Sequence, residues 1–155
     1  MNQEEKTVKM VMSKTVMAIE PNVSAKDCAK AMAKRGVSCA VITQGGSAVG
    51  IVTERDLVSK VLAESIDAKN VLVRDIMSTP LITVAPDAPL TGAAELMARY
   101  RIRRLVVVGT DGAMAGLVTT GDIARTLAEK QGYREATLNA MARYSEGGPG
   151  NGPYQ

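Results

Sequence analysis

The hydrophobic and polar positions of this chain change repeatedly between a helical period and short, continuous apolar runs. Between residues 24 and 35, small and apolar side chains recur every three or four positions, as in a helix with one buried face. Ser24 and Asp27 have the spacing of a capping box at its start, and Gly36 lies where such a helix ends. Apolar runs flanked by a Gly-rich turn then predict a buried hairpin. The predicted elements are helix 24–35, strand 39–43, turn 44–47, strand 48–52 and helix 54–63.

The same order returns in the second half of the chain. Pro89 suits the first turn of the next helix, where a missing backbone N–H costs nothing. The predicted elements are helix 89–100, strand 105–108, turn 110–112, strand 114–118 and a helix from 123 to about 129. Each half is therefore expected to be a β-α-β-β-α unit. Further on, the sequence predicts a weak amphipathic helix over 134–144 and disorder over the Gly- and Pro-rich stretch 145–153.

Residues 11–62 and 76–128 align as two copies of one unit. An offset of 65 aligns the start of the copies, and one extra residue in the second hairpin makes the offset 66. The best match is then GIVTERDL at 50–57 against GLVTTGDI at 116–123. A unit of roughly 50 residues buries its apolar faces poorly by itself, so the copies are expected to pack on each other.

The two copies set the expected domain boundaries. Val8-Lys9 resembles Val73-Arg74, which places the start of each repeat a few residues before the best-aligned part. The resulting domains are repeat 1 at 8–65, repeat 2 at 73–130 and a C-terminal segment at 131–155. The expected fold class is α/β (α+β), with two tandem β-α-β-β-α repeats packed as a pseudo-two-fold pair.

Composition narrows the functional classes. The chain has no histidine, which removes the usual general base and the commonest transition-metal ligand, and it has no Phe or Trp to stack on bases. A net charge of +3, spread along 155 residues, argues further against nucleic acid. No apolar run has membrane-spanning length and the first residues are acidic, so a cytoplasmic location is expected.

The two cysteines indicate neither a metal site nor a disulfide. Cys28 and Cys39 occupy dissimilar positions of the first copy and lack the CxxC spacing. With no clear cationic partner nearby in the sequence, Cys39 is expected to be a small buried side chain and not a reactive thiol.

The Gly-h-Val-Thr-x-x-Asp stretch, in which h is apolar, is the strongest chemical signal because it occurs in both copies. It leads from a strand into a helix start, where backbone N–H groups favour an anion, and its carboxylate suits a ribose diol. The alternative is purely structural, because Thr53 with Asp56 and Thr119 with Asp122 also fit capping boxes. The pattern alone leaves both interpretations open.

Three arginines of the second copy form a second candidate feature. Arg101, Arg103 and Arg104 precede the predicted strand 105–108, at positions where the first copy has uncharged residues. Two of them could clamp a phosphate. Since alternate residues of a strand point to opposite faces, a solvated strand edge is the other interpretation.

Taken with the Met-Ser segment and proline that open each copy, the GIVTERD and GLVTTGD motifs resemble those of tandem cystathionine β-synthase (CBS) domains. The resemblance covers about residues 8–130. It implies a pair of repeats packed through their sheets, with adenosine nucleotides bound in clefts between the copies. In such a cleft the Asp of the motif would hold the ribose, and the Thr and basic residues would hold the phosphates.

Carried over residue by residue, the resemblance implies two unequal clefts. The first would be lined by Ala18, Val23, Val37, Ser38, Cys39, Arg103, Arg104, Thr119 and Asp122. The second would be lined by Thr83, Ala88, Ile102, Arg103, Thr53 and Asp56. The Asp122 cleft is expected to bind more tightly because it gathers Arg103 and Arg104. Arg55 and Gly121 stand directly before the aspartates, where the family often has a hydroxyl.

The resemblance implies a regulatory module that binds AMP, ADP or ATP, with AMP as the expected ligand, and that signals to a partner protein not identifiable from the sequence. It implies no catalysis, no cofactor, no metal and no membrane partner. A homodimer is expected, since the flanking helices carry apolar residues at Leu57, Val61, Ile123 and Leu127. The alternatives are a ligand-free dimerisation module, a site for S-adenosylmethionine or another adenosine derivative, and a nucleotide hydrolase that uses Asp56 or Asp122.

Overall fold

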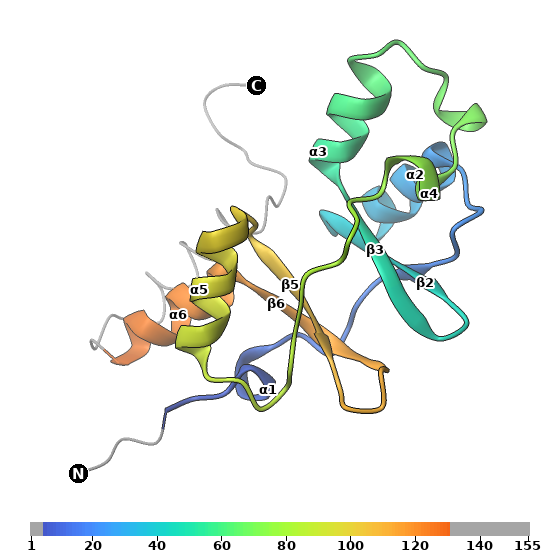
Figure 1. Cartoon of the computed structure of the whole chain (residues 1–155). Coiled ribbons are helices and arrows are strands. Elements are labelled where there is room, and N and C mark those ends of the chain that lie inside the picture. The colour runs from blue at the N-terminus through green and yellow to red at the C-terminus, as the bar shows by residue number, and fades with distance from the viewer. Residues whose placement is uncertain (1–4, 131–155) are drawn as a thin grey trace, which may run out of the picture.

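The computed structural model of the chain describes residues 5–130 and contains two three-stranded sheets, each covered by helices (Figure 1). The strand orders are β1-β2-β3 and β4-β5-β6, so each half of the sequence builds its own sheet. The predicted α/β class with two β-α-β-β-α units is confirmed. The helix predicted over 134–144 and the disorder predicted over 145–153 lie outside the described residues.

The first repeat follows the predicted order of elements. It contains β1 (Ala18–Ile19), α2 (Ala25–Arg35), β2 (Cys39–Gln44), β3 (Ser47–Thr53) and α3 (Glu54–Leu57). Strand β2 pairs parallel with β1 and antiparallel with β3. The Ser24 hydroxyl caps α2 by accepting the N–H of Asp27, and Gly36 ends it in the left-handed conformation, as the capping signals predict.

The second repeat has the same topology. It contains β4 (Thr83–Val84), α5 (Leu90–Tyr100), β5 (Arg104–Val108), β6 (Met114–Thr119) and α6 (Thr120–Lys130). Strand β5 pairs parallel with β4 and antiparallel with β6. Helix α6 begins three residues before the predicted position, since the chain turns helical directly after Thr119.

The helix predicted over 54–63 is only partly α-helical. After α3 the chain continues as a π-helix, η1 (Val58–Leu62), in which the Ala63 N–H donates to the Val58 carbonyl five residues earlier. The Ser59 hydroxyl donates to the Arg55 carbonyl at 2.7 Å, a local side-chain bond that competes with the regular ladder. Short π segments are frequent at functional sites, and this one directly follows the motif aspartate of the first repeat.

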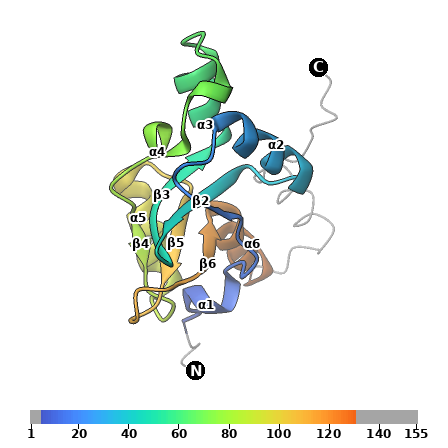
Figure 2. The ribbon, with the colours of Figure 1, turned by 90° about the vertical axis from the view of Figure 1, so that its right-hand side faces the viewer.

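The short helix that leads each repeat packs on the other repeat. Helix α1 (Val8–Val11) lies beside β6 and α6, whereas α4 (Val73–Ile76) lies beside β3 (Figures 1 and 2). Val8 belongs to the apolar core of the second repeat and Val73 to that of the first, and neither side chain is exposed. The Val8 and Val73 N–H groups donate to carbonyls at equivalent places, Ala88 and Val23.

This exchange explains the glycine of the repeated motif. The segment after α4 pairs with β3 through an isolated antiparallel bridge between Ser78 and Ile51. The segment after α1 pairs with β6 through the equivalent bridge between Ser13 and Leu117. A Cβ added at Gly116 would lie 2.5 Å from the Ser13 carbonyl oxygen. The close approach of another backbone therefore requires a residue without a side chain at that position.

Exposed apolar side chains differ from those predicted to form a dimer contact. Val61 and Ile123 are buried in the two cores, because the helices turn these faces toward their own sheets. The expectation that they are exposed was wrong. Leu127 is exposed as predicted, at 55%, whereas Leu57 is partly buried against the core of the first repeat. Val58 and Leu62, which were not predicted, are exposed at 55% and 74%. Within residues 5–130, no helix has the length and apolar character needed to cross a membrane.

Candidate functional site

Both motif aspartates form the capping boxes that their spacing predicts. Asp56 accepts the N–H of Thr53 at 2.9 Å and the Thr53 hydroxyl at 3.1 Å, both on Oδ2, while the Asp56 N–H donates to Thr53 Oγ1. Asp122 makes the same three contacts with Thr119, at 2.8, 3.0 and 3.2 Å. Each cap thus uses only Oδ2 of its carboxylate.

Each of these aspartates lines its own cavity, and both cavities are bounded by the two repeats. The Asp56 cavity has a volume of about 540 Å³ and the Asp122 cavity about 180 Å³. Small-molecule sites commonly measure roughly 300–1,000 Å³. Only the Asp56 cavity therefore has, as it stands in this structure, the volume of an ordinary ligand site.

The leading segments close one side of each cavity. Residues 13 and 15–17, which follow α1, line the Asp122 cavity together with residues 36–39. Residues 78 and 80–82, which follow α4, line the Asp56 cavity together with residues 101–104. The segment that follows the leading helix of each repeat therefore lines the cavity of the other repeat's motif aspartate.

Three residues line both cavities and so lie between them. They are Ser38, Arg103 and Arg104. Arg104 Nη2 donates to the Ser38 hydroxyl at 2.7 Å, which fixes this half-buried guanidinium in place. A cation held in this position can act on a ligand in either cavity.

The CBS domain family model matches residues 8–63 and 73–129, which together make up most of the chain. The chain belongs to the CBS domain family. An uncharacterized protein of Methanopyrus kandleri is 37% identical over 138 residues, which cover 88% of this chain and 68% of that protein.

Solved CBS structures share the fold. The CBS domain pair of protein MJ0100, in complex with 5-methylthioadenosine and S-adenosyl-L-methionine, has a TM-score of 0.73 at 30% identity, with 81% of this chain and 98% of that chain covered. The hexameric CBS-CP12 protein of a bloom-forming cyanobacterium has a TM-score of 0.75 at 26% identity, with 97% and 88% covered. Structures of this family thus include a ligand complex with adenosine derivatives and an oligomer.

In this CBS pair, most of the residues predicted for the two clefts line the two cavities. Val37, Ser38, Cys39, Arg103, Arg104, Thr119 and Asp122 line the Asp122 cavity. Thr53, Asp56, Ile102 and Arg103 line the Asp56 cavity.

Four of the predicted residues line neither cavity. Ala18 and Thr83 lie in the two-residue edge strands β1 and β4, where each is exposed. Val23 and Ala88 pack against the two apolar cores, and their carbonyl groups accept hydrogen bonds from the first residues of α4 and α1. The resemblance to CBS domains placed all four in the clefts, whereas the packing of α1 and α4 gives Val23 and Ala88 a structural role.

The charge distribution differs from the one predicted. The Asp122 cavity was expected to hold more basic residues, but Arg103 and Arg104 line both cavities. The Asp56 cavity has three further cationic side chains, which are Arg55, Lys60 and Arg101. Arg55 and Lys60 come from the same helical segment as Asp56, so comparing strand starts between the copies could not find them.

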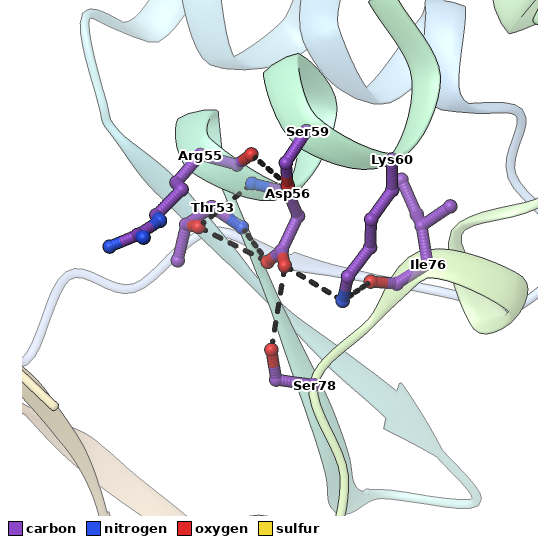
Figure 3. A network of polar contacts seen from close by, with 7 residues as sticks. All are labelled: Thr53, Arg55, Asp56, Ser59, Lys60, Ile76 and Ser78. Carbon is purple, nitrogen blue, oxygen red and sulfur yellow. Dashed lines mark hydrogen bonds and ion pairs between the residues drawn. The ribbon is translucent and has the colours of Figure 1, made fainter. Parts of the chain in front are cut away.

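Lys60 is the functional candidate that the sequence reasoning missed (Figure 3). Its Nζ lies 2.9 Å from Asp56 Oδ1 and donates to the Ile76 carbonyl at 2.7 Å. The Ser78 hydroxyl also reaches Oδ1, at 3.5 Å. An acid and a base four residues apart on a helix are a recognised pairing signal, and this spacing of Asp56 and Lys60 was visible in the sequence.

The cysteine beside the cavities is a buried thiol, as predicted. Cys39 is 8% exposed and lines the Asp122 cavity. Burial raises the pKa of its thiol, Arg104 opposes this rise and Glu54 adds to it. The group therefore stays protonated near neutral pH, which favours a packing role over nucleophilic chemistry.

Proposed function

We propose that this CBS pair is a non-catalytic module that binds AMP, ADP or ATP in its cavities and passes the bound state on to a partner protein. One observation carries the proposal: two Thr-held carboxylates line cavities that share Arg103 and Arg104. A carboxylate is a fitting acceptor for a ribose diol, and guanidinium groups are fitting donors to phosphate.

The known ligands of a similar protein support the adenosine part of this proposal. The CBS pair of protein MJ0100 was crystallised with 5-methylthioadenosine and S-adenosyl-L-methionine, which share an adenosine group. These two ligands lack the 5′-phosphate of AMP. The arginines of the present chain favour the phosphorylated ligands over these two, because neither has an anionic group attached at the ribose 5′ carbon.

Calorimetric titration of the full chain with AMP, ADP, ATP and S-adenosylmethionine tests the proposal. At least one of the three nucleotides should bind with a Kd in the micromolar range or tighter, which corresponds to about 8 kcal/mol or more. The melting temperature should rise with the same nucleotide. The proposal fails if none of the three binds at millimolar concentration, and binding of S-adenosylmethionine alone would favour the alternative ligand class.

Hydrolysis is the competing enzymatic function for the same aspartates. Within residues 5–130, no group of three or more His, Cys, Asp or Glu side chains is arranged to hold a metal ion. Both aspartates are held by caps, and Asp56 is also paired with Lys60. We propose that both bind and neither activates water. Release of phosphate from ATP by pure protein, lost in an Asp56→Asn or Asp122→Asn variant, would contradict this.

We also propose that the chain self-associates. Val58 and Leu62 are four residues apart on η1 and thus share a face, and both are exposed, as is Leu127 on α6. Light scattering at micromolar concentration should give a mass of at least twice 16.3 kDa. Leu62→Glu combined with Leu127→Glu should lower it to one chain, with exposed Met10→Glu on α1 as the control that leaves it unchanged. A monomeric wild-type protein would refute self-association and leave nucleotide binding open.

A further inference from the structure

The two cavities differ in charge as well as in volume. Among residues 5–130, five cationic side chains and two carboxylates line the Asp56 cavity: Arg55, Lys60, Arg101, Arg103 and Arg104 against Glu54 and Asp56. Among the same residues, two cations and one carboxylate line the Asp122 cavity: Arg103 and Arg104 against Asp122. The larger cavity is therefore also the one with the greater excess of positive charge, which suits a ligand with more negative charge.

Lys60 neutralises the carboxylate that would otherwise repel such a ligand. Asp56 is only 7% exposed, and an unpaired carboxylate at such a position is costly. The ammonium of Lys60 lies 2.9 Å from its Oδ1, and a second N–H of the ammonium is used by the Ile76 carbonyl (Figure 3). Since an ammonium has three N–H donors, a third remains for a ligand or solvent. The exposed half of the Lys60 side chain gives that donor access to the cavity.

The second repeat has no cation at the position equivalent to Lys60. The position equivalent to Lys60, four residues after the motif aspartate, holds Thr126, which is 5% exposed and donates to the Asp122 carbonyl at 3.0 Å. The Asp122 carboxylate accepts the N–H and the hydroxyl of Thr119 on Oδ2. At the position of the lysine that neutralises Asp56, Asp122 thus has an uncharged threonine.

We infer that the two cavities take different ligands and that Lys60 sets the difference. The Asp56 cavity takes an adenosine nucleotide with two or more phosphates, and the Asp122 cavity takes an adenosine compound with one phosphate or none. This inference rests on the proposed nucleotide binding and adds the phosphate count of each site. Lys60 is a specificity-determining residue because its charge cancels that of Asp56, which would otherwise weaken binding of a polyanion and strengthen binding of an uncharged nucleoside.

The expected effect follows from Coulomb's law. A unit charge within about 8 Å of a phosphate, in partly screened surroundings, changes the affinity for each charged group by roughly tenfold. Removing the charge of Lys60 should therefore lower the affinity for ATP and raise that for adenosine. The affinity for ATP divided by that for adenosine should fall by about tenfold or more. A substitution that weakens the binding of both ligands equally would leave this ratio unchanged.

The experiment compares ATP and adenosine by calorimetry on five proteins, the wild type and four variants. Lys60→Thr installs the residue that the second repeat has, and Lys60→Arg retains the charge. Lys69→Thr is the matched control, because Lys69 forms an exposed ion pair with Asp67 and lines neither cavity. Melting curves establish that each variant is folded. An Ile102→Trp substitution in the wild-type background fills the Asp56 cavity and so shows which binding event belongs to it.

In Lys60→Thr, the ratio of the affinity for ATP to the affinity for adenosine should be lower than in wild type. In Lys60→Arg and Lys69→Thr, this ratio should stay within about threefold of the wild-type value. The ATP event should disappear in Ile102→Trp. An unchanged ratio in a folded Lys60→Thr protein, or an equal loss of both ligands, would overturn the role of Lys60. Tight ATP binding that survives in a folded Ile102→Trp protein would overturn the assignment of cavities. If wild type binds no nucleotide at all, the proposed function itself fails.

Discussion

The guanidinium of Arg104 donates a 2.7 Å hydrogen bond to the hydroxyl of Ser38, which joins the start of β5 in the second repeat to the residue before β2 in the first. Both residues line both cavities. The wall between the two sites is therefore a polar contact between the repeats, and the same cation faces whatever is bound on either side.

Replacing Arg104 by Ala should weaken nucleotide binding at both sites. A charge-assisted hydrogen bond contributes about 1.5–3 kcal/mol, so each Kd should rise roughly ten- to a hundredfold. Calorimetry with AMP and ATP measures this, with Arg99→Ala as control, because Arg99 is exposed on α5 and lines neither cavity. A variant in which only one binding event changes would show that Arg104 serves a single site.

The tighter binding of ATP should belong to the Asp56 cavity, contrary to the ranking that the sequence suggested. Its volume and its additional cations, Arg55, Lys60 and Arg101, support this reversal. Ile102 and Val37 occupy equivalent positions at the two cavities, so that Ile102→Trp and Val37→Trp form a matched pair that leaves charge unchanged. Ile102→Trp should remove the tight event and Val37→Trp should spare it. The opposite pattern in folded variants would restore the original ranking.

The same two variants provide an independent signal. The wild-type chain contains no Trp, so each introduced indole is the only one in the protein. In Val37→Trp the fluorescence should respond to a nucleotide only if the ligand enters the Asp122 cavity.

Gly116→Ala should destabilise the fold more than Gly50→Ala, although the two glycines are equivalent. An added Cβ at Gly116 meets the backbone oxygen of Ser13 at 2.5 Å, whereas at Gly50 it meets the flexible end of Met77, with Sδ at 2.5 Å. Overpacking that moves backbone costs about 1–3 kcal/mol. Gly92→Ala on α5, where nothing lies closer than 3.6 Å, should raise stability by about 0.5–1 kcal/mol. Urea titrations measure all three, and equal losses at Gly50 and Gly116 would contradict the explanation.

The protein should lose stability between about pH 9 and 11 in part through Cys28. Burial raises the pKa of this thiol from 9.0 to about 11. The unfolded chain releases the proton first as pH rises, so the contribution is complete below pH 9 and is lost toward pH 11. The loss amounts to about 2–3 kcal/mol. Cys28→Ala should start less stable but decline less steeply in denaturant titrations across this range. Parallel curves for the two proteins would count against the buried thiol.

Much of the local structure was predictable because local signals agree with each other. Ser24, Asp27 and Gly36 mark the two ends of α2, and the paired motif predicted both capping boxes. Chemical interpretation was harder, because the same Thr–Asp contacts satisfy a cap and also orient a carboxylate. The sequence could not separate the two roles, since the residues that form each cap also line a cavity.

Contacts that cross the repeats were not predictable. Val8 and Val73 have the same apolar pattern around them, and nothing in that pattern tells which repeat will bury them. The cavities depend on this choice, because the segments after α1 and α4 form their walls. The incorrect ranking of the cavities has a related cause. It compared the basic residues at aligned strand starts, whereas Lys60 is aligned with Thr126 and forms an ion pair with Asp56 of its own helical segment.

The exchange of leading helices means that the repeat in the sequence and the folded unit are different pieces of chain. A protein cut between residues 63 and 73 would leave the first copy without Val73 and Ile76, and would leave the second copy without Val8. A single copy could complete its core only by borrowing a helix from another molecule. Because one chain carries both copies, the exchange of leading helices does not depend on protein concentration. A displacement of one repeat is transmitted through its leading helix to the core of the other repeat.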